Sequence, residues 1–204
     1  MLTKRIVLSK IIRKFRYRSG EMHQFKLHLY DDVSLVAPTI QHANEMFEAV
    51  DCNRAHLRQF LDWVDMTTSV EDEQKFLKTI LSLQAEGKAK LYFIYKANEL
   101  IGTVDLHQFN EEGRFAEIGY WLVEKYTGQG IITKVVKEIC KIAFQDLALN
   151  KVTLRAEADN HASQQVAMKC GFRYVGTMEQ HIYRKSKEAY VDLKYYELLK
   201  EKLT

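Results

Sequence analysis

Residues 117–133 read EIGYWLVEKYTGQGIIT, and this stretch decides the fold. Its first part, through Val123, is a run of apolar and aromatic residues that is typical of a buried strand. Two glycines, Gly128 and Gly130, follow, and from Ile131 the apolar residues recur at helical spacing as far as Leu147. The stretch therefore predicts a strand that ends in a glycine-bearing turn and leads into a long helix.

That turn has the composition of an anion site. Gly128 and Gly130 let the backbone come close to a ligand and adopt a positive φ. The first amides of a helix have no intrahelical partner and lie at the positive end of its dipole, so a pyrophosphate could bind there. Alone, the two glycines are equally explained by a tight turn, because the motif is shorter than a dinucleotide fingerprint and lacks the Lys-Ser/Thr of a P-loop.

Periodicity outside this stretch predicts the other elements. Before it we expect a strand over 24–36, helices over 39–50, 57–64 and 69–87, and three hairpin-connected strands over 91–95, 100–107 and 115–123. After it we expect a strand at 152–156, a helix at 160–170, and closing strands at 172–177 and 189–199, the last of which also fits a helix. This order predicts an α/β (α+β) fold with a mixed, mostly antiparallel sheet and a βαβ crossover near its middle.

Length and composition fit one globular domain. The chain has 204 residues, of which 47% are hydrophobic and 28% charged, both ordinary for a globular protein. No stretch approaches the roughly 18–20 apolar residues of a membrane span. The three cysteines, Cys52, Cys140 and Cys170, are an odd number without metal-like spacing. They predict reduced thiols in a cytoplasmic protein that holds no metal.

The positive charge is concentrated at the N-terminus. The net charge is +3, yet residues 1–20 carry seven basic residues and no acid, so the remaining residues carry −4. We therefore divide the chain into a basic N-terminal extension, residues 1–21, and a globular body, residues 22–204. The extension suits an RNA or ribosome contact, a membrane-surface helix or a targeting peptide, or it is a segment that the body does not need.

The stretch and its surroundings resemble the GNAT acetyltransferase superfamily. Within it, the chain is similar to the ribosomal-protein N-terminal acetyltransferases, the Rim-type branch. The matching residues are Ala116–Leu122, Tyr126, Gly128–Ile131, Thr133, Leu149–Val152, Asn160, Ser163, Lys169–Phe172, Tyr190–Leu193, Tyr195, Leu198 and Leu199. Two positions depart from the superfamily's pyrophosphate motif: Thr127 stands where Gln or Arg is common, and Ile132 stands where Gly or Ala is common.

The resemblance implies transfer of an acetyl group from acetyl-CoA to an amine, by direct attack in a ternary complex. The strand ending at Val123 and the strand starting at Val152 would splay apart and admit the pantetheine arm of the donor. It implies no metal. The cofactor-binding residues that it implies are Trp121, Leu122, Val123, Gly128, Gln129, Gly130, Ile131, Thr133 and Asn160.

The resemblance also implies catalytic roles. Glu117 is the candidate base, acting through a water, and the alternative is a solvated or salt-bridged strand residue. Ser163 is the candidate that protonates or stabilises the leaving thiolate, while Asn160 binds the pantetheine. The alternative for both is that they only cap the helix that begins there. His107 is a lesser candidate.

The acceptor is less well determined than the donor. The loop 61–69 would border it, where Asp62 and Asp65 could attract a cationic amine, or could simply be solvated. The resemblance favours the N-terminal α-amine of a protein such as a ribosomal protein, with association to the ribosome. Alternatives are a small amine, such as a polyamine or an amino sugar, and a noncatalytic acyl-CoA-binding module. Both a monomer and a homodimer are compatible with the sequence.

Overall fold

A single eight-stranded sheet organises the molecule in this computed structural model, which describes residues 26–202. The strand order is β1-β2-β3-β4-β5-β6-β8-β7. The strands are β1 (Lys26–Tyr30), β2 (Val33–Val36), β3 (Lys90–Lys96), β4 (Glu99–Asn110), β5 (Phe115–Leu122), β6 (Lys151–Glu157), β7 (Arg173–Arg184) and β8 (Ala189–Leu199). The basic extension, residues 1–21, lies outside the described residues, so the division at residue 21 stays a prediction.

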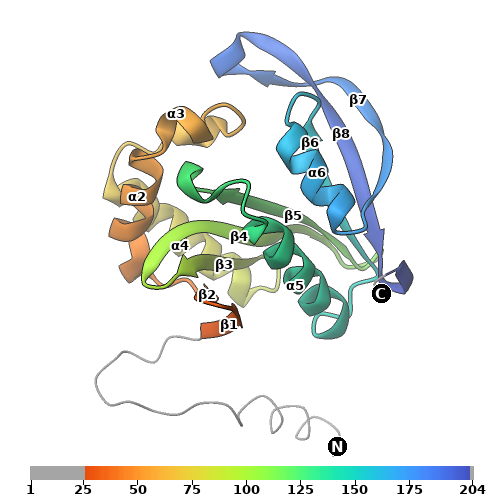
Figure 1. The fold of residues 1–204 in the computed structure, drawn as a ribbon, viewed down its shortest axis with the longest axis horizontal. Helices are drawn as coiled ribbons and strands as arrows, with labels where there is room; N and C mark the ends of the chain where they lie inside the picture. Colours follow the sequence, from red (N-terminus) through yellow and green to blue (C-terminus); the bar gives the residue numbers. More distant parts are fainter. Residues whose placement is uncertain (1–25, 203–204) are drawn as a thin grey trace, which may run out of the picture.

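The main helices pack on the four middle strands of the sheet. Helices α2 and α4 pack on each other and on β3 and β4, while α5 and α6 pack on β5 and β6 (Figure 1). The helices are α2 (Ala43–Asp51), α3 (Arg54–Leu57), α4 (Val70–Ala85), α5 (Ile131–Gln145) and α6 (His161–Lys169). Short 3₁₀ turns are η2 (Ile40–His42), η3 (Asp62–Asp65), η4 (Glu124–Tyr126), η5 (Lys185–Lys187) and η6 (Lys200–Lys202).

The predicted crossover is present at the middle of the sheet. Strand β5 pairs in parallel with β6, and α5 connects them. The other pairings of the sheet are antiparallel. Parallel neighbours need a long connection, and a helix supplies it. The expected fold class, a mixed and mostly antiparallel sheet with a central βαβ unit, is therefore confirmed.

Three predicted elements differ from the structure. The strand predicted over 24–36 is a hairpin of β1 and β2, turned at Asp31, which adopts a φ of 44°. The helix predicted over 57–64 is replaced by the short α3 and the turn η3. Strand β7 extends to Arg184, well beyond the predicted 177, because β8 supplies it with a partner along that length.

The core lies between the sheet and its helices. Fully buried side chains include Phe93 and Ile101 of the sheet and Ile139 and Phe144 of α5. Burying side chains of this size contributes roughly 1.5–3 kcal/mol each, so α5 is fixed firmly on the strands that it connects. Within residues 26–202, no helix combines the length and apolarity needed to cross a membrane, and no group of three or more potential metal ligands is present.

Candidate active site

The start of α5 provides an open anion site. Gly130 is the N-cap residue, with a φ of +75°, and Gly128 has a φ of +72°. A Cβ atom built on either glycine would meet no atom within 4 Å, so space for a ligand lies beside both. The first turn of α5 carries no acidic residue. Unpaired amides, the helix dipole and open space together fit a pyrophosphate.

Strands β5 and β6 separate immediately beyond this site. Their parallel register covers only Phe115 to Glu117 of β5, opposite Lys151 to Thr153 of β6. Beyond it, β5 continues to Leu122 beside β4, and β6 continues to Glu157 beside β8. The edges that β5 and β6 turn toward each other there are left without a strand partner, which suits an extended amide-bearing ligand arm.

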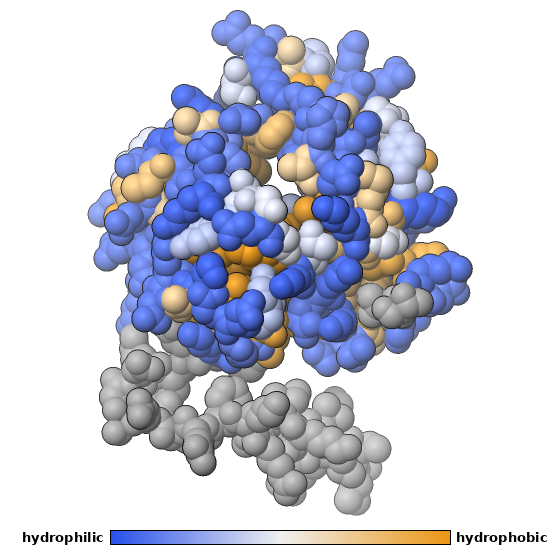
Figure 2. All heavy atoms as spheres, in the orientation of Figure 1, coloured by the Kyte–Doolittle hydropathy of each residue, from blue (hydrophilic) through white to orange (hydrophobic). Residues whose placement is uncertain are grey.

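A cavity of about 350 Å³ joins these two features. Figure 2 shows this face of the molecule hollowed between α3 and α6, with hydrophobic residues beside the hollow. Seven of the residues implied as cofactor-binding line the cavity: Trp121, Leu122, Gly128, Gly130, Ile131, Thr133 and Asn160. The other two are not among its lining residues. Val123 donates its backbone N–H to Ile101, and the Gln129 amide donates to the Lys125 carbonyl at 2.9 Å.

The cavity also has a wall that no sequence motif predicts. His56, Leu57 and Phe60, on α3 and just after it, lie across from α6. These residues are more than sixty positions from the glycine turn, and no local pattern marks them as site residues. Lys169, at the end of α6, adds a positive charge to the lining, which suits a phosphorylated ligand.

Ser163 and Tyr120 form a polar pair inside the cavity. The Ser163 hydroxyl lies 2.8 Å from the Tyr120 hydroxyl, and either group can donate. Burial raises the pKa of Tyr120, so the phenol stays protonated at neutral pH. The Asn160 side chain accepts a hydrogen bond from the Ser163 backbone N–H at 3.0 Å and caps α6. Asn160 therefore does cap the helix, whereas the Ser163 hydroxyl faces Tyr120.

Glu117 lies in a row of charged side chains. Its carboxylate is 2.6 Å from Arg155 Nε and 3.4 Å from His107 Nε2, and His107 Nδ1 is 3.0 Å from Asp105. Burial alone would lower the pKa of His107, but its hydrogen bonds to Asp105 and Glu117 outweigh burial and raise that pKa to about 9. At neutral pH, Glu117 is thus flanked by two cations.

The charged surroundings of Glu117 come from neighbouring strands and not from its own sequence neighbours. Phe115 and Tyr120 are close to Glu117 along the chain, but a strand residue is surrounded mainly by its cross-strand neighbours. His107 is directly opposite Glu117 in the β4–β5 register, and Arg155 lies two residues beyond its β6 partner Thr153. The salt-bridged arrangement, one of the two sequence-based alternatives, is present.

A second cavity, of about 220 Å³, contains Glu117 and meets the first. Arg155 and Glu157 of β6 and Arg184 of β7 also line it. The two cavities share five lining residues, which are Phe60, Leu61, Tyr120, Asn160 and Ser163. A ligand in each cavity would therefore approach the other beside the Ser163 hydroxyl. This is the geometry that a transfer between two substrates requires.

The acids of the loop 61–69 are paired with arginines. Asp62 Oδ2 lies 3.1 Å from Arg184 Nη1, and Asp65 Oδ1 lies 2.7 Å from Arg58 Nη2. Neither carboxylate is therefore unpaired and available to attract a cationic acceptor, as the sequence had suggested. Asp65 lines neither cavity, whereas Asp62 holds a residue that lines the second one.

Sequence comparison identifies the family. The model of the acetyltransferase (GNAT) domain matches residues 32–173, most of the chain. The chain belongs to the GNAT acetyltransferase family. It is 31% identical, over 166 residues, to the ribosomal-protein-serine acetyltransferase of Escherichia coli strain K12, covering 81% of this chain and 92% of the relative.

Solved structures of GNAT enzymes agree with this assignment. A RimL ribosomal L7/L12 α-N-protein acetyltransferase in complex with coenzyme A superposes with a TM-score of 0.82 at 28% identity, covering 86% of this chain and 98% of that one. An acetyltransferase from Salmonella typhimurium gives a TM-score of 0.78 at 27% identity, covering 86% and 99%. The protein is an acetyl-CoA-dependent N-acetyltransferase, and acetyl-CoA is its donor substrate.

Proposed function

We propose that this enzyme acetylates the N-terminal α-amine of a protein, such as a ribosomal protein. The observation that carries the proposal is the junction of the two cavities at Ser163 and Tyr120. The first cavity, beside the glycine turn, suits the donor. The second cavity is then left for the acceptor, which would deliver its amine beside Ser163. The relatives support a protein acceptor, since one is named for a ribosomal-protein serine and another for modifying the N-terminal serine of ribosomal protein L7/L12.

The residues of the first cavity hold the donor. The amides of Gly128, Gly130 and Ile131 bind the pyrophosphate, and the separated edges of β5 and β6 with Asn160 bind the amide-bearing arm. Acetyl-CoA supplies an activated acetyl group as a thioester. Trp121 and Leu122, at the end of β5, exclude water from the arm, since both are buried.

The residues at the junction move the protons. Ser163 Oγ donates its proton to the departing sulfur as the C–S bond breaks. The attacking nitrogen releases a proton as the amide forms, and this proton restores the Ser163 hydroxyl through the neighbouring Tyr120 hydroxyl, 2.8 Å away. Glu117 accepts the proton of the incoming ammonium through a water, so that the amine attacks in its neutral form. Arg155 and His107 fix the Glu117 carboxylate at the second cavity.

A thiol-release assay with an acceptor panel tests the proposal. The panel contains short peptides with free serine or alanine N-termini, the same peptides with a blocked N-terminus, polyamines and amino sugars. We expect turnover with the free peptides and none with the blocked ones, and mass spectrometry should locate the acetyl group on the α-amine. Turnover restricted to polyamines or amino sugars would contradict a protein acceptor and leave the acetyltransferase assignment intact.

A further inference from the structure

An arginine connects three segments around the second cavity. Glu157, at the end of β6, is buried to 3% exposure, and its carboxylate contacts Arg184 Nε and lies 2.7 Å from Lys187 Nζ. From the same guanidinium, Arg184 Nη1 reaches Asp62 of η3 at 3.1 Å. The planar, multiply donating guanidinium is suited to holding two carboxylates at once. Arg184 therefore links β6, the β7–β8 hairpin and the loop 61–69.

The two ends of this link differ in rigidity. Glu157 belongs to a strand paired with β8, and removing either partner of a buried ion pair is strongly destabilising. Asp62 belongs to a 3₁₀ turn whose own shape is set by Arg54, which donates to the carbonyls of Val64 and Thr67. Arg54 ties the loop to α3, so it does not fix the distance from the loop to the hairpin.

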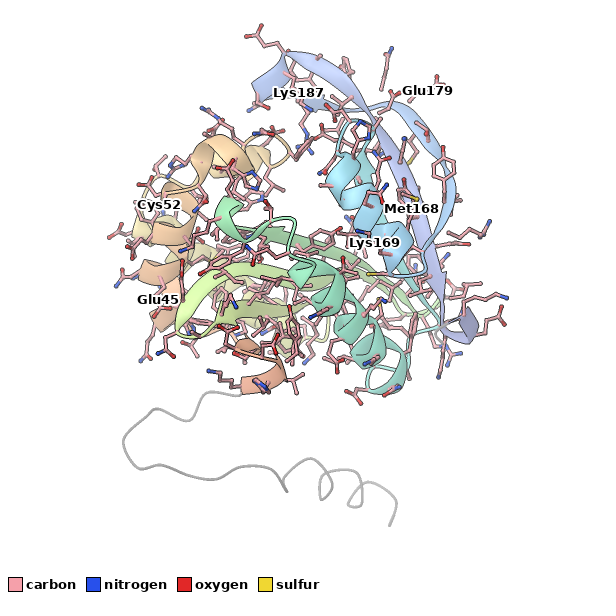
Figure 3. The ribbon with its side chains drawn as sticks, in the orientation of Figure 1. Glu45, Cys52, Met168, Lys169, Glu179 and Lys187 are labelled. Carbon is pink, nitrogen blue, oxygen red and sulfur yellow. The ribbon has the colours of Figure 1, made fainter. Side chains whose placement is uncertain are left out.

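The loop meets the hairpin beside the second cavity. Besides the Asp62–Arg184 pair, Lys187 Nζ lies 5.0 Å from the centre of the Phe60 ring. Figure 3 labels Lys187 at the end of the β7–β8 hairpin, above the space that separates the hairpin from α3. Phe60 and Arg184 both line the second cavity, so these contacts set the separation of two of its walls.

We propose that the Asp62–Arg184 ion pair determines acceptor selectivity by holding the loop 61–69 against the β7–β8 hairpin, which limits the size of the first side chain that the acceptor cavity admits. This inference rests on the proposed function, because it assumes an acceptor in the second cavity. Asp62 and Arg184 act as positioning residues: Arg184 is anchored by Glu157, and Asp62 attaches the loop to it.

Two single variants break the pair without removing the charge that Glu157 needs. Asp62→Asn removes the loop carboxylate. Arg184→Lys keeps a cation for Glu157 but loses the second donor that reaches Asp62. Asp65→Asn is the matched control, since Asp65 is on the same 3₁₀ turn, is paired with Arg58 and lines neither cavity.

Kinetics with two peptides that differ only in their first residue, serine or tryptophan, provide the first measurement. We expect Asp62→Asn and Arg184→Lys each to reduce the kcat/KM preference for serine about tenfold, mainly through the KM of the peptide. The calorimetric Kd for acetyl-CoA should not change. The double variant should resemble either single variant, because both remove one interaction. Equal preferences in Asp62→Asn and Asp65→Asn, or additive effects in the double variant, would overturn the inference.

Amide hydrogen exchange over residues 61–69 provides a second measurement that needs no acceptor. Loss of a contact that holds a loop in place increases its local opening. Exchange should accelerate in Asp62→Asn and Arg184→Lys and stay unchanged in Asp65→Asn. If the wild-type enzyme accepted no peptide, the proposed function would fail while this exchange pattern still supported the loop attachment. An unchanged exchange rate in Asp62→Asn would sink the inference even in an active peptide acetyltransferase.

Discussion

Ser163 lines both cavities, and removal of its hydroxyl should affect chemistry rather than binding. A positioned proton donor contributes 10²–10⁴-fold to a rate, so we expect Ser163→Ala to lower kcat about 100-fold. The Kd for acetyl-CoA should stay unchanged, because the contacts of the glycine turn and of Asn160 are retained. Tyr120→Phe keeps the ring and should lower kcat less. Steady-state kinetics with calorimetry measure both, and a Ser163→Ala variant with wild-type kcat would exclude the proton-donor role.

His107 makes stability depend on pH in a defined window. Its pKa is raised from 6.5 to about 9, so its contribution is fully present below pH 6.5 and is lost as pH rises through 9. The His107 side chain is 33% exposed, so solvent screening limits the contribution to roughly 1–2 kcal/mol. Urea unfolding should show His107→Gln less stable than wild type at pH 6, with the difference vanishing by pH 10. If the difference in free energy of unfolding between the variant and wild type did not vary with pH, His107 would not be held charged by Asp105 and Glu117.

Sequence spacing predicts residues that line the first cavity better than those that line the second. Gly128, Gly130, Asn160 and Ser163 belong to local motifs, a turn before a helix and a helix cap, so sequence spacing places them. Arg155 and Arg184 belong to no such motif. Their positions at the second cavity depend on strand register and on the length of β7, which a single strand's sequence does not determine.

At the turn that begins α5, the backbone strain caused by replacing a glycine can be separated from the effect of that replacement on ligand binding. Gly130→Ala places an L-residue at a φ of +75°, which costs about 1–2 kcal/mol. Gly87, at the end of α4, has the same φ of +75° and the same open surroundings, but lines neither cavity. Both alanine variants should lose similar stability, whereas only Gly130→Ala should weaken acetyl-CoA binding, by about tenfold. Thermal unfolding measures the losses of stability, and calorimetry measures the Kd for acetyl-CoA. Equal acetyl-CoA affinities in the two variants would argue against the turn as the pyrophosphate site.

Element boundaries were predictable where a turn signal and a change of period coincide. The helix expected over 69–87 is one case: the Ser69 side chain accepts a hydrogen bond from the Asp72 backbone N–H, and α4 begins immediately after Ser69. The hairpin of β1 and β2 was missed because its turn uses Asp31 and Asp32 in place of glycine, so the alternation continues across it. Asp31 adopts a left-handed conformation that aspartate tolerates better than most residues.

At the scale of the whole molecule, the crossover predicted from one stretch of sequence contributes strands to the walls of both cavities. The β5–β6 register ends at Glu117, and the second cavity is lined by Glu117 of β5 and Arg155 of β6. Two elements far apart in the chain, η3 and the end of β7, meet beside the second cavity through Arg184. Such contacts have no sequence periodicity, which is why residues of the first cavity can be predicted from the sequence and Arg184 of the second cannot.

Glu73, which lines neither cavity, gives the stability of the molecule a second dependence on pH. It is buried to 2% exposure on α4, and its Oε1 atom has no hydrogen-bond partner among the described residues. Burial, aided by the charge of Asp72 and opposed by that of Arg54, raises the pKa of Glu73 from 4.5 to about 7. The folded state therefore binds the proton more tightly than the unfolded state, and stability falls as pH rises from 4.5 through 7.

The variant Glu73→Gln tests this pH dependence. Its side chain is permanently neutral, so its free energy of unfolding should match that of wild type near pH 4.5 and exceed it by roughly 2–3 kcal/mol at pH 8. Urea unfolding at both pH values measures the difference. A variant less stable than wild type at pH 8 would mean that the charged carboxylate has a partner that stabilises it.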